Sequence, residues 1–321
     1  MAPLEEAGDA DRAVLIERDD LAALPAGFDP AEYRRHNGDL VRMTDDELAH
    51  HYVVHGADEG RRCSRVHDRG SFLAVVPATA SILEIGPFWA PAFRRPAFDV
   101  AYLDALDTEQ LRRKAQADPN SGGAVVPEID YVWRGEPYRT LIGRTFDVVF
   151  SSHNIEHQPD LIGHFLDVAD VLRPDGLMML VVPDKRYCFD HFLPESDIAD
   201  VVQARTQRRT RHTVAKVLAD QMMHAHNDPA RHWKGDHGAD PRHAPTNSYR
   251  IDCLRRIFAY EAEARDGAGA YVDAHAWQFT PGSFAAIVDQ LEASGLIPFR
   301  RLQVYPTVSG SFEFYAALAR K

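Results

Sequence analysis

Cysteine, long apolar runs and excess positive charge are all scarce in this sequence. The three cysteines, Cys63, Cys188 and Cys253, lie far apart and form no CxxC pair. A disulfide scaffold and a cysteine-based zinc site are therefore excluded, and a reducing cytoplasm is the expected compartment. No apolar run approaches the roughly 20 residues of a membrane helix. The acidic start MAPLEEAGDADRAV also lacks the apolar core of a signal peptide, so we expect no membrane insertion.

Basic residues are outnumbered, with 36 Lys and Arg against 48 Asp and Glu and a net charge of −12. Proteins that bind nucleic acid are usually basic, because phosphate contacts supply most of that affinity. We therefore expect no nucleic-acid partner. A length of 321 residues with 45% hydrophobic content indicates a soluble globular protein with one large domain and an accessory segment. Nothing in the sequence indicates an oligomeric state.

Glycine is scarce in the stretch that most resembles a cofactor loop, SILEIGPFWAPAF at 81–93. It has neither the GxGxxG pattern of dinucleotide sites nor the Lys-Ser/Thr of an ATP or GTP loop. A pyrophosphate needs close backbone approach, which Phe88 and Trp89 would obstruct. A cofactor without phosphates removes that demand. S-adenosylmethionine is such a cofactor, and its sulfonium cation suits aromatic faces and carboxylates.

Changes in pattern divide the chain into an acidic tail, a small helical module, a core in two pieces, and a substrate-capping insert between them. The predicted boundaries are 1–20, 21–65, 72–183 with 278–321, and 184–277. Asp29-Pro30 and the Thr44/Glu47 pair predict two helix starts in the module. The insert is expected to hold a helix over 198–223, a His/Asp/Pro-rich loop, and a further helical stretch.

Strands and helices alternate through the core. This pattern predicts an α/β, Rossmann-like, seven-stranded and mostly parallel sheet with helices on both faces. The third strand is expected within GGAVVPEIDYVW, 122–133. The closing strands LIPFRRLQVYPT and GSFEFYAALARK are close enough to pair as a hairpin, so the last strand should run antiparallel.

Polar residues follow the expected strands, and ligands of an open parallel sheet bind at that edge. The residues at these positions are Glu84, Gly86, Asp104, Asp130, Ser151, Ser152, His153 and Asp184. Asp104 lies about 20 residues beyond the glycine turn, the spacing of an acid that binds ribose hydroxyls. Asp130 could accept a hydrogen bond from the amino group of an adenine.

Four segments carry a resemblance to a known family: LEIGPF, the YLD acid, FDVVFSSHNIEHQPDL and LRPDGLMMLVVPDKRY. They resemble the successive motifs of class I S-adenosylmethionine-dependent methyltransferases. The nearest likeness is to bacterial methyltransferase-domain proteins with LEIGP, SHxxEHxPDL and PDKRYxFD segments. Separately, FDPAEYRRHNGDL…HYVVHGADEGR resembles a module with NPDL and HYxxxGxxEGR signatures that accompanies glycan-modifying domains.

The resemblance implies roles for individual residues. Glu84 and Gly86 would lie against the methionine tail, with Phe88 in a stiff aromatic turn beside the cofactor. Asp104 would bind the ribose and Asp130 the adenine amine. The floor near the methyl group would be lined by Ser152 and His153. Pro87-Phe88 departs from the family's usual GxGxG.

A histidine at a strand tip can take a proton from a hydroxyl as the oxygen attacks the methyl carbon, and His153 is so placed. His157 is an alternative base, although a packing role suits it equally. Asp184 and His275 are rival bases. Acceptor contacts are expected from residues of the insert, namely Lys185, Arg186, Tyr187, His232, Trp233 and His275.

Two further clusters of charged and polar residues could be either solvated surface or ligand-binding sites. His224, His226, His232, His237 and His243, with Asp228, Asp236 and Asp240, could supply ligands for a divalent ion, but their spacing fits no closed zinc pattern. We favour a polar substrate-capping loop and predict no metal site. The run of Arg205, Arg208, Arg209, Arg211 and Lys216 could meet an anionic acceptor, although a solvated helix face is favoured.

The sequence therefore predicts a methyltransferase that uses S-adenosylmethionine and methylates an oxygen of a saccharide or another hydroxyl-bearing small molecule. N-methylation or small-molecule methylation in secondary metabolism is the first alternative. The second is a non-catalytic scaffold that keeps the fold and binds a glycan or a protein partner through residues 1–65 and the insert.

Overall fold

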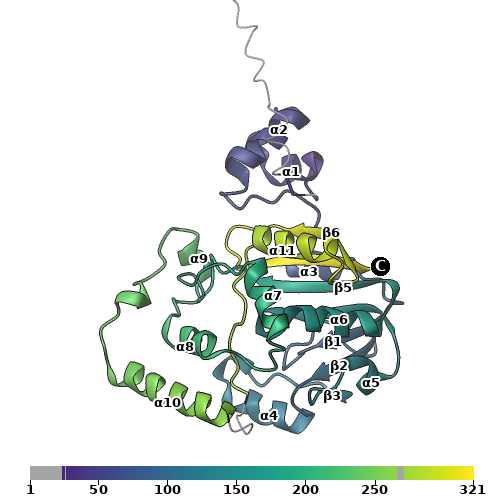
Figure 1. The fold of residues 1–321 in the computed structure, drawn as a ribbon. Helices are drawn as coiled ribbons and strands as arrows, with labels where there is room; N and C mark the ends of the chain where they lie inside the picture. The colour runs from purple at the N-terminus through teal and green to yellow at the C-terminus, as the bar shows by residue number, and fades with distance from the viewer. Residues whose placement is uncertain (1–23, 26, 266–270) are drawn as a thin grey trace, which may run out of the picture.

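The computed structural model describes residues 24–25, 27–265 and 271–321 (Figure 1). Within these residues one seven-stranded sheet has the order β3-β2-β1-β4-β5-β7-β6. All neighbouring strands pair in parallel except those that flank β7, which runs antiparallel to both β5 and β6. The expected Rossmann-like sheet with an antiparallel last strand is confirmed.

The strands are β1 (Ser81–Ile85), β2 (Asp99–Asp104), β3 (Tyr131–Val132), β4 (Phe146–Ser152), β5 (Leu172–Pro183), β6 (Phe299–Tyr305) and β7 (Glu313–Arg320). The core helices are α3 (Arg69–Leu73), α4 (Thr108–Ala117), α5 (Tyr138–Ile142), α6 (Leu161–Val171) and α11 (Pro281–Ala293). Short helical turns follow α4 at η4 (Pro119–Ser121) and β4 at η5 (Ile155–His157).

Apolar residues bury both faces of the sheet, as the near-continuous hydrophobic strands require. Along β1, Leu83 and Ile85 face one cluster, which includes Phe165 of α6 and residues of α5, α7 and α11. Ile82 faces the opposite cluster, which includes Phe72 of α3. Successive side chains of a strand point to opposite faces, so each strand contributes to both layers.

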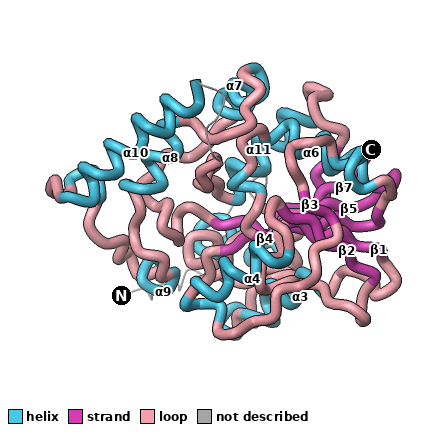
Figure 2. Tube along the Cα trace, turned by 90° about the horizontal axis from the view of Figure 1, so that it is seen from below, coloured by secondary structure: helices cyan, strands magenta, loops and turns pink. Residues whose placement is uncertain are grey.

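The insert contains α7 (Ile198–Thr206), α8 (Val214–Met222), α9 (Pro229–His232), η6 (Pro241–His243) and α10 (Ser248–Arg265). The single helix expected over 198–223 is wrong, because residues 207–213 break it. Arg208 has a positive φ of 51° there, and the Thr213 side chain caps α8. In both views α8, α9 and α10 lie beside the sheet rather than over its faces (Figures 1 and 2).

The N-terminal unit contains α1 (Pro30–His36), η2 (Gly38–Leu40), α2 (Asp45–His51) and the π-helical turn η3 (Tyr52–Gly56). Both expected helix starts are confirmed. Asp29 accepts hydrogen bonds from the first turn of α1, and Thr44 and Glu47 form a capping box on α2. The unit has its own apolar cluster around Tyr33, Leu48, Tyr52 and neighbouring residues, and it lies at the top of Figure 1.

Gly60 joins this unit to the rest of the molecule. Its carbonyl oxygen accepts a 2.9 Å hydrogen bond from the Ser309 N–H. Trp233 of the insert lies against it, and the Trp233 indole donates to the Ser311 carbonyl at 2.7 Å. The other side of Trp233 is occupied by Tyr187, stacked at 3.9 Å. The predicted domain boundaries stay predictions, and the 1–20 tail lies outside the described residues.

The third strand is much shorter than expected. The predicted strand covered 122–133, but only Tyr131–Val132 pairs with β2. Gly122 and Gly123 have φ values of 55° and 80°, which turn the chain away from an extended path. Among the described residues no helix combines the length and apolar character that crossing a bilayer requires.

The contact at Gly60 generates a stability prediction. A Cβ at Gly60 would lie 2.4 Å from the Trp233 ring and 2.6 Å from the Ser309 nitrogen, with φ at +63°. Gly122 shares a positive φ of +55° but has open space around its Cα. We expect Gly122→Ala to cost about 1 kcal/mol of backbone strain. Gly60→Ala should cost about 2–3 kcal/mol, because overpacking adds to the strain. Denaturant unfolding of both variants tests this, and equal losses would contradict the packing argument.

Candidate active site

The candidate site lies where the strand order reverses, between the carboxyl ends of β1 and β4. An open α/β sheet binds ligands at such a switch point. Gly86 leaves β1 with a φ of +70° and donates its N–H to the Leu103 carbonyl on β2 at 2.9 Å. A Cβ on Gly86 would lie 3.1 Å from the Asn154 amide nitrogen, beyond the end of β4. Gly86 therefore keeps the backbone accessible at this crevice.

Glu84 lies within β1 rather than after it, and only 3% of the residue is exposed. Its two carboxylate oxygens accept hydrogen bonds from the Ala92 and Phe93 N–H groups, at 2.7 and 3.1 Å. Burial raises the pKa of Glu84 to about 7, despite these two hydrogen bonds. Glu84 therefore fixes the segment after β1 through these two backbone hydrogen bonds.

Phe88 and Trp89 form the expected aromatic turn. Phe88 has a positive φ of 42°, and both rings pack against Leu111 and Ala115 of α4. Lys114 lies over the Phe88 ring, 5.1 Å from its centroid. The turn is thus braced by α4 as well as by Glu84. A position of Phe88 beside the cofactor stays a prediction.

Asp104 ends β2, next to Gly86. Its Oδ1 accepts a hydrogen bond from the Leu106 N–H at 2.9 Å. Burial raises the pKa of Asp104, and the nearby charge of Asp273 acts in the same direction. A partly buried carboxylate at this edge is suited to accept hydrogen bonds from ribose hydroxyls.

Asp130 does not follow the third strand, because β3 begins at Tyr131. Its Oδ2 accepts the Tyr102 N–H at 2.8 Å and also pairs with Arg95. These contacts place the acid level with the middle of β2 and give it a structural function. The expected position of Asp130 is therefore corrected, and Trp133 to Glu136 are the residues that follow β3.

Ser152 and His153 lie at the tip of β4. His153 has a φ of +48°, and its N–H donates to the Val181 carbonyl at 3.0 Å. The ring Nε2 lies 2.8 Å from the Glu313 carboxylate at the start of β7. Burial would raise the pKa of Glu313, but hydrogen bonds from His153 and Arg69 lower it to about 2. Glu313 is therefore a fixed anion that orients His153.

A second histidine pair lies beyond β4. His157 Nδ1 is 2.9 Å from Asp273, and His275 Nδ1 is 2.6 Å from Asp190. The two rings meet edge to face with centroids 4.6 Å apart. Burial alone would lower the pKa of His157, but Asp273 and Glu156 raise it to about 9. His157 thus carries a proton at neutral pH.

Glu156 lies beside this pair and is fully buried. Neither of its carboxylate oxygens has a hydrogen-bond partner among the described residues. The neighbouring ring nitrogens of His153 and His157 lie 3.7 and 3.8 Å from Oε1, too far to form hydrogen bonds. A buried carboxylate that accepts no hydrogen bond is costly and indicates a ligand.

Asp184, one of the predicted bases, is occupied by its own neighbours. It is fully buried, and its oxygens accept hydrogen bonds from Arg186 and from the Thr307 hydroxyl. No lone pair is left for an acceptor proton, so we do not retain Asp184 as a base. The Lys185 ammonium is likewise occupied, donating to the His191 carbonyl.

The other predicted acceptor residues lie in three separate places. Tyr187 and Trp233 stack on each other at the contact with Gly60, where they join parts of the fold. His275 lies with the residues beyond β4. His232 is buried in the insert, with its Nδ1 2.9 Å from that of His237.

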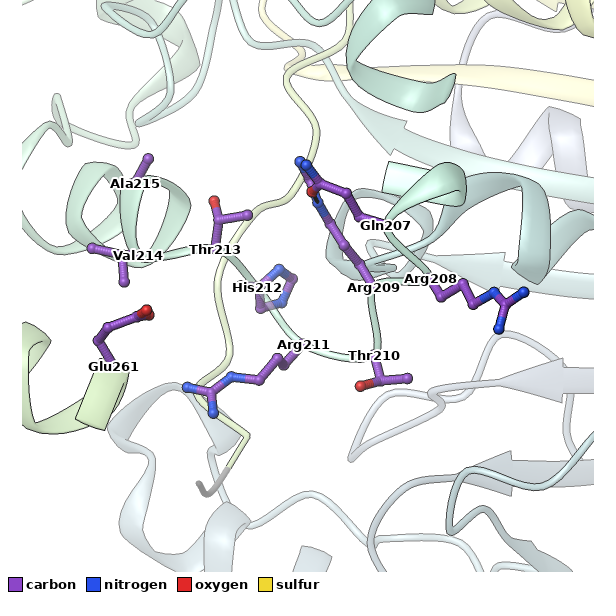
Figure 3. A pocket seen from close by; sticks show the side chains of 10 residues that line it. All are labelled: Gln207, Arg208, Arg209, Thr210, Arg211, His212, Thr213, Val214, Ala215 and Glu261. Carbon is purple, nitrogen blue, oxygen red and sulfur yellow. Dashed lines mark hydrogen bonds between the residues drawn. The ribbon is translucent and has the colours of Figure 1, made fainter. Parts of the chain in front are cut away.

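The basic run begins in α7 with Arg205 and ends in α8 with Lys216. Its middle part, residues 207–213, forms a loop with a cleft of about 500 Å³ beside it (Figure 3). The side chains of Arg208, Arg209 and Arg211 diverge from this loop and do not converge on one point. Arg211 donates to the Tyr260 hydroxyl and lies over its ring. These three arginines share no anion site. The expected helix face is corrected to a loop for them, whereas Arg205 and Lys216 lie on helices.

Sequence reasoning missed Asp190, Asp273 and Glu313, and it did not single out Glu156. Asp190, Asp273 and Glu313 each orient a histidine of the site. Glu156 stands within the SSHNIEH motif, so an acid between two histidines was a usable signal. Asp273 and His275 alternate in DAHAW, just before the α/β pattern resumes, which was a second signal.

Comparison with known proteins gives one family and several remote structural likenesses. A family model described as a methyltransferase domain matches residues 56–260. The structure of the glycopeptide N-methyltransferase MtfA with sinefungin aligns with 36% of this chain and 52% of its own, at 19% identity and a TM-score of 0.27. The chain thus spans about half the length of that protein. No curated protein matches.

Two further structures align over more of the chain. The CcbJ methyltransferase from Streptomyces caelestis covers 78% of this chain and 86% of its own, at 13% identity and a TM-score of 0.36. An S-adenosylmethionine-dependent methyltransferase from Mesorhizobium loti covers 78% and 96%, at 16% identity and a TM-score of 0.35. These likenesses are too remote to indicate what this chain acts on.

The burial of Glu84 generates a pH prediction. Its pKa is about 7 in the folded protein and about 4.3 in an unfolded chain. The unfolded state therefore ionises first, and stability falls as pH rises from 4 to 7. Between pH 5 and pH 8 the wild type should lose about 2.5 kcal/mol more than Glu84→Gln, which cannot titrate. Urea unfolding of both proteins at the two pH values measures this, and parallel profiles would refute the raised pKa.

Proposed function

The chain belongs to the methyltransferase-domain family, whose model matches residues 56–260. We propose that it binds its cofactor between the carboxyl ends of β1 and β4 and transfers a methyl group there to a hydroxyl oxygen of the acceptor. The expected enzyme class and cofactor are confirmed: the chain is an S-adenosylmethionine-dependent methyltransferase. Membership of the bacterial subgroup with the LEIGP, SHxxEHxPDL and PDKRYxFD segments stays a prediction. The place of the site is argued from one observation: Gly86, Asp104 and His153 lie together at one edge of the sheet.

The residues present fit the cofactor. The space beside Gly86 would be filled by a Cβ 3.1 Å from Asn154, so only glycine leaves the backbone open to a methionine tail. Asp104 accepts the hydrogen bonds of the ribose hydroxyls in this proposal. Glu84 supports the intervening turn through two backbone N–H groups. When bound, S-adenosylmethionine supplies an electrophilic methyl group on a sulfonium sulfur.

We assign the general base to His153. Its Nε2 is held by Glu313 at 2.8 Å, which leaves Nδ1 to take the proton of the acceptor hydroxyl. The acceptor oxygen forms its bond to the methyl carbon as the carbon–sulfur bond breaks, and the electron pair stays on sulfur. His157 is not the base, because a pKa of about 9 keeps it protonated at neutral pH.

The acceptor in this proposal is a saccharide or a similar hydroxyl-bearing small molecule. Support comes from the polar lining beyond β4, where His157, Asp273 and the Tyr271 hydroxyl meet. Such groups match sugar hydroxyls better than apolar substrates. The resemblance of the N-terminal unit to a glycan-associated module points in the same direction and stays a prediction.

Binding of S-adenosylhomocysteine tests the assignment of Asp104. Asp104→Ala should weaken binding about 10- to 100-fold, because it removes a charged hydrogen-bond acceptor. Asp99→Ala is the matched control, since Asp99 begins the same strand at the opposite edge and is exposed. Calorimetry measures both variants. Equal affinity in Asp104→Ala and wild type would show that the ribose lies elsewhere.

Turnover tests the assignment of His153. His153→Asn should lower kcat about 100-fold or more and leave S-adenosylhomocysteine affinity unchanged, because a base acts on the acceptor. Asn tolerates the left-handed backbone at this position. Transfer of labelled methyl groups to a panel of saccharides supplies the assay. Retained turnover in the variant would remove His153 as the base.

A further inference from the structure

We propose that Glu156, His157 and His275 bind a divalent first-row transition-metal ion. One carboxylate oxygen and one nitrogen from each ring lie within 4.8 Å of one another. Glu156 Oε1 and His157 Nε2 are 3.8 Å apart. Zinc holds its ligands at about 2.0–2.2 Å, so two ligands of one ion lie about 3–4 Å apart. The separation in the structure is therefore close to that of a metal centre.

The unpartnered carboxylate of Glu156 is the observation that points to a ligand. Glu156 is fully buried, and both of its oxygens lack hydrogen-bond partners among the described residues. His153 and His157 lie at ion-pair distance from Glu156 Oε1, 3.7 and 3.8 Å, but neither ring donates a hydrogen bond to it. A metal ion at this point would satisfy the carboxylate directly.

Both histidines already have a carboxylate partner on their other ring nitrogen. His157 Nδ1 is hydrogen-bonded to Asp273 at 2.9 Å and His275 Nδ1 to Asp190 at 2.6 Å. In protein metal sites a ligating histidine usually donates its other N–H to a carboxylate or carbonyl, which fixes the tautomer and the ring orientation. Nε2 is then the nitrogen of each ring that is available to an ion, and an ion bound there displaces the proton that His157 Nε2 holds in the metal-free protein. His157 Nε2 lies 3.8 Å from Glu156 Oε1.

The position of the ligands is fixed by the backbone. The Ala276 and Trp277 N–H groups both donate to the Glu156 carbonyl, at 2.7 and 3.1 Å. These bonds hold His275 against the turn that carries Glu156 and His157. The two imidazole planes are inclined at 88°, which suits two rings directed at one ion.

The histidine cluster of the insert is a weaker candidate. His191, His232 and His237 also bring three nitrogens within 4.8 Å. However, the His191 and His237 rings stack almost parallel, with an interplanar angle of 10° and centroids 3.7 Å apart. Their lone pairs therefore cannot both be directed at one ion without rotation of a ring. This cluster also has no buried carboxylate to neutralise a cation.

Two imidazoles and one carboxylate indicate the class of metal. Zinc, iron and manganese accept this ligand set, whereas magnesium and calcium prefer oxygen ligands. Three protein ligands leave at least one coordination position open. If the proposed function holds, that position orients the acceptor oxygen and lowers the pKa of its hydroxyl. The metal site itself does not depend on that function.

Metal content after removal and reloading is the direct test. The full chain is stripped with a chelator, loaded separately with Zn²⁺, Mn²⁺ or Co²⁺, desalted, and analysed by mass spectrometry of the metal. We expect about one equivalent in the wild type. Glu156→Gln and His275→Gln should each weaken binding at least about tenfold, while His237→Gln in the other cluster should retain it. The visible spectrum of the Co²⁺ form reports the same site without relying on activity.

Two results would overturn the proposal: no retained metal in the wild type with any of the three ions, or loss of the metal in His237→Gln but not in Glu156→Gln. If Glu156→Gln does not fold, His275→Gln and the Co²⁺ spectrum of the wild type decide. S-adenosylhomocysteine binding is measured in parallel on the metal-free and metal-loaded chain. If that binding fails while metal is retained, the proposed function fails and the metal site stands.

Discussion

Two backbone hydrogen bonds onto one carbonyl oxygen hold the candidate site together. The Ala276 and Trp277 N–H groups both donate to the Glu156 carbonyl, and the Trp277 indole donates to the Gln158 carbonyl at 2.6 Å. They attach the segment that returns from the insert to the turn after β4. Trp277 is almost fully buried, so this attachment is part of the hydrophobic core. Asp273 and His275 reach His157 because of it.

The site concentrates negative charge at the edge of the sheet. Glu156 and Asp190 are almost completely buried there, and each has at least one carboxylate oxygen without a hydrogen bond from a described residue. Buried carboxylate oxygens that accept no hydrogen bond destabilise a fold. A protein retains such groups where they perform a task, and perturbed groups gather at functional sites. The raised pKa of His157 has the same origin, since Asp273 and Glu156 favour a cation at its position.

The sequence allowed the sheet, its closing antiparallel strand and the edge that holds the site to be predicted. The alternation of apolar strands and helices can be read from neighbouring residues. Polar residues that follow the strands indicate the carboxyl edge of the sheet. The capping residues Asp29 and Thr44 were predictable for the same reason. The turn after β1 was predicted correctly as a turn with one glycine followed by two aromatic residues. The hydrogen bonds by which Glu84 supports that turn were not predicted.

Other features could not be predicted, because they depend on contacts between distant residues. The sequence predicted Asp184 as a base, but in the structure its carboxylate accepts hydrogen bonds from Arg186 and Thr307. Trp233 looked like an acceptor contact, but it joins the insert to Gly60. The pairing of His157 with Asp273 joins the turn after β4 to the far end of the insert, and no local pattern encodes such a pairing.

The central claim is that the crevice between β1 and β4 holds the cofactor with its methyl group facing His153. A crystal structure with S-adenosylhomocysteine bound tests this most directly. The account predicts the ribose hydroxyls on Asp104, the amino acid tail over Gly86, and the sulfur on the side of His153. A ligand bound in the cleft beside Arg208 to Arg211, or at any position that leaves Asp104 uncontacted, would contradict it.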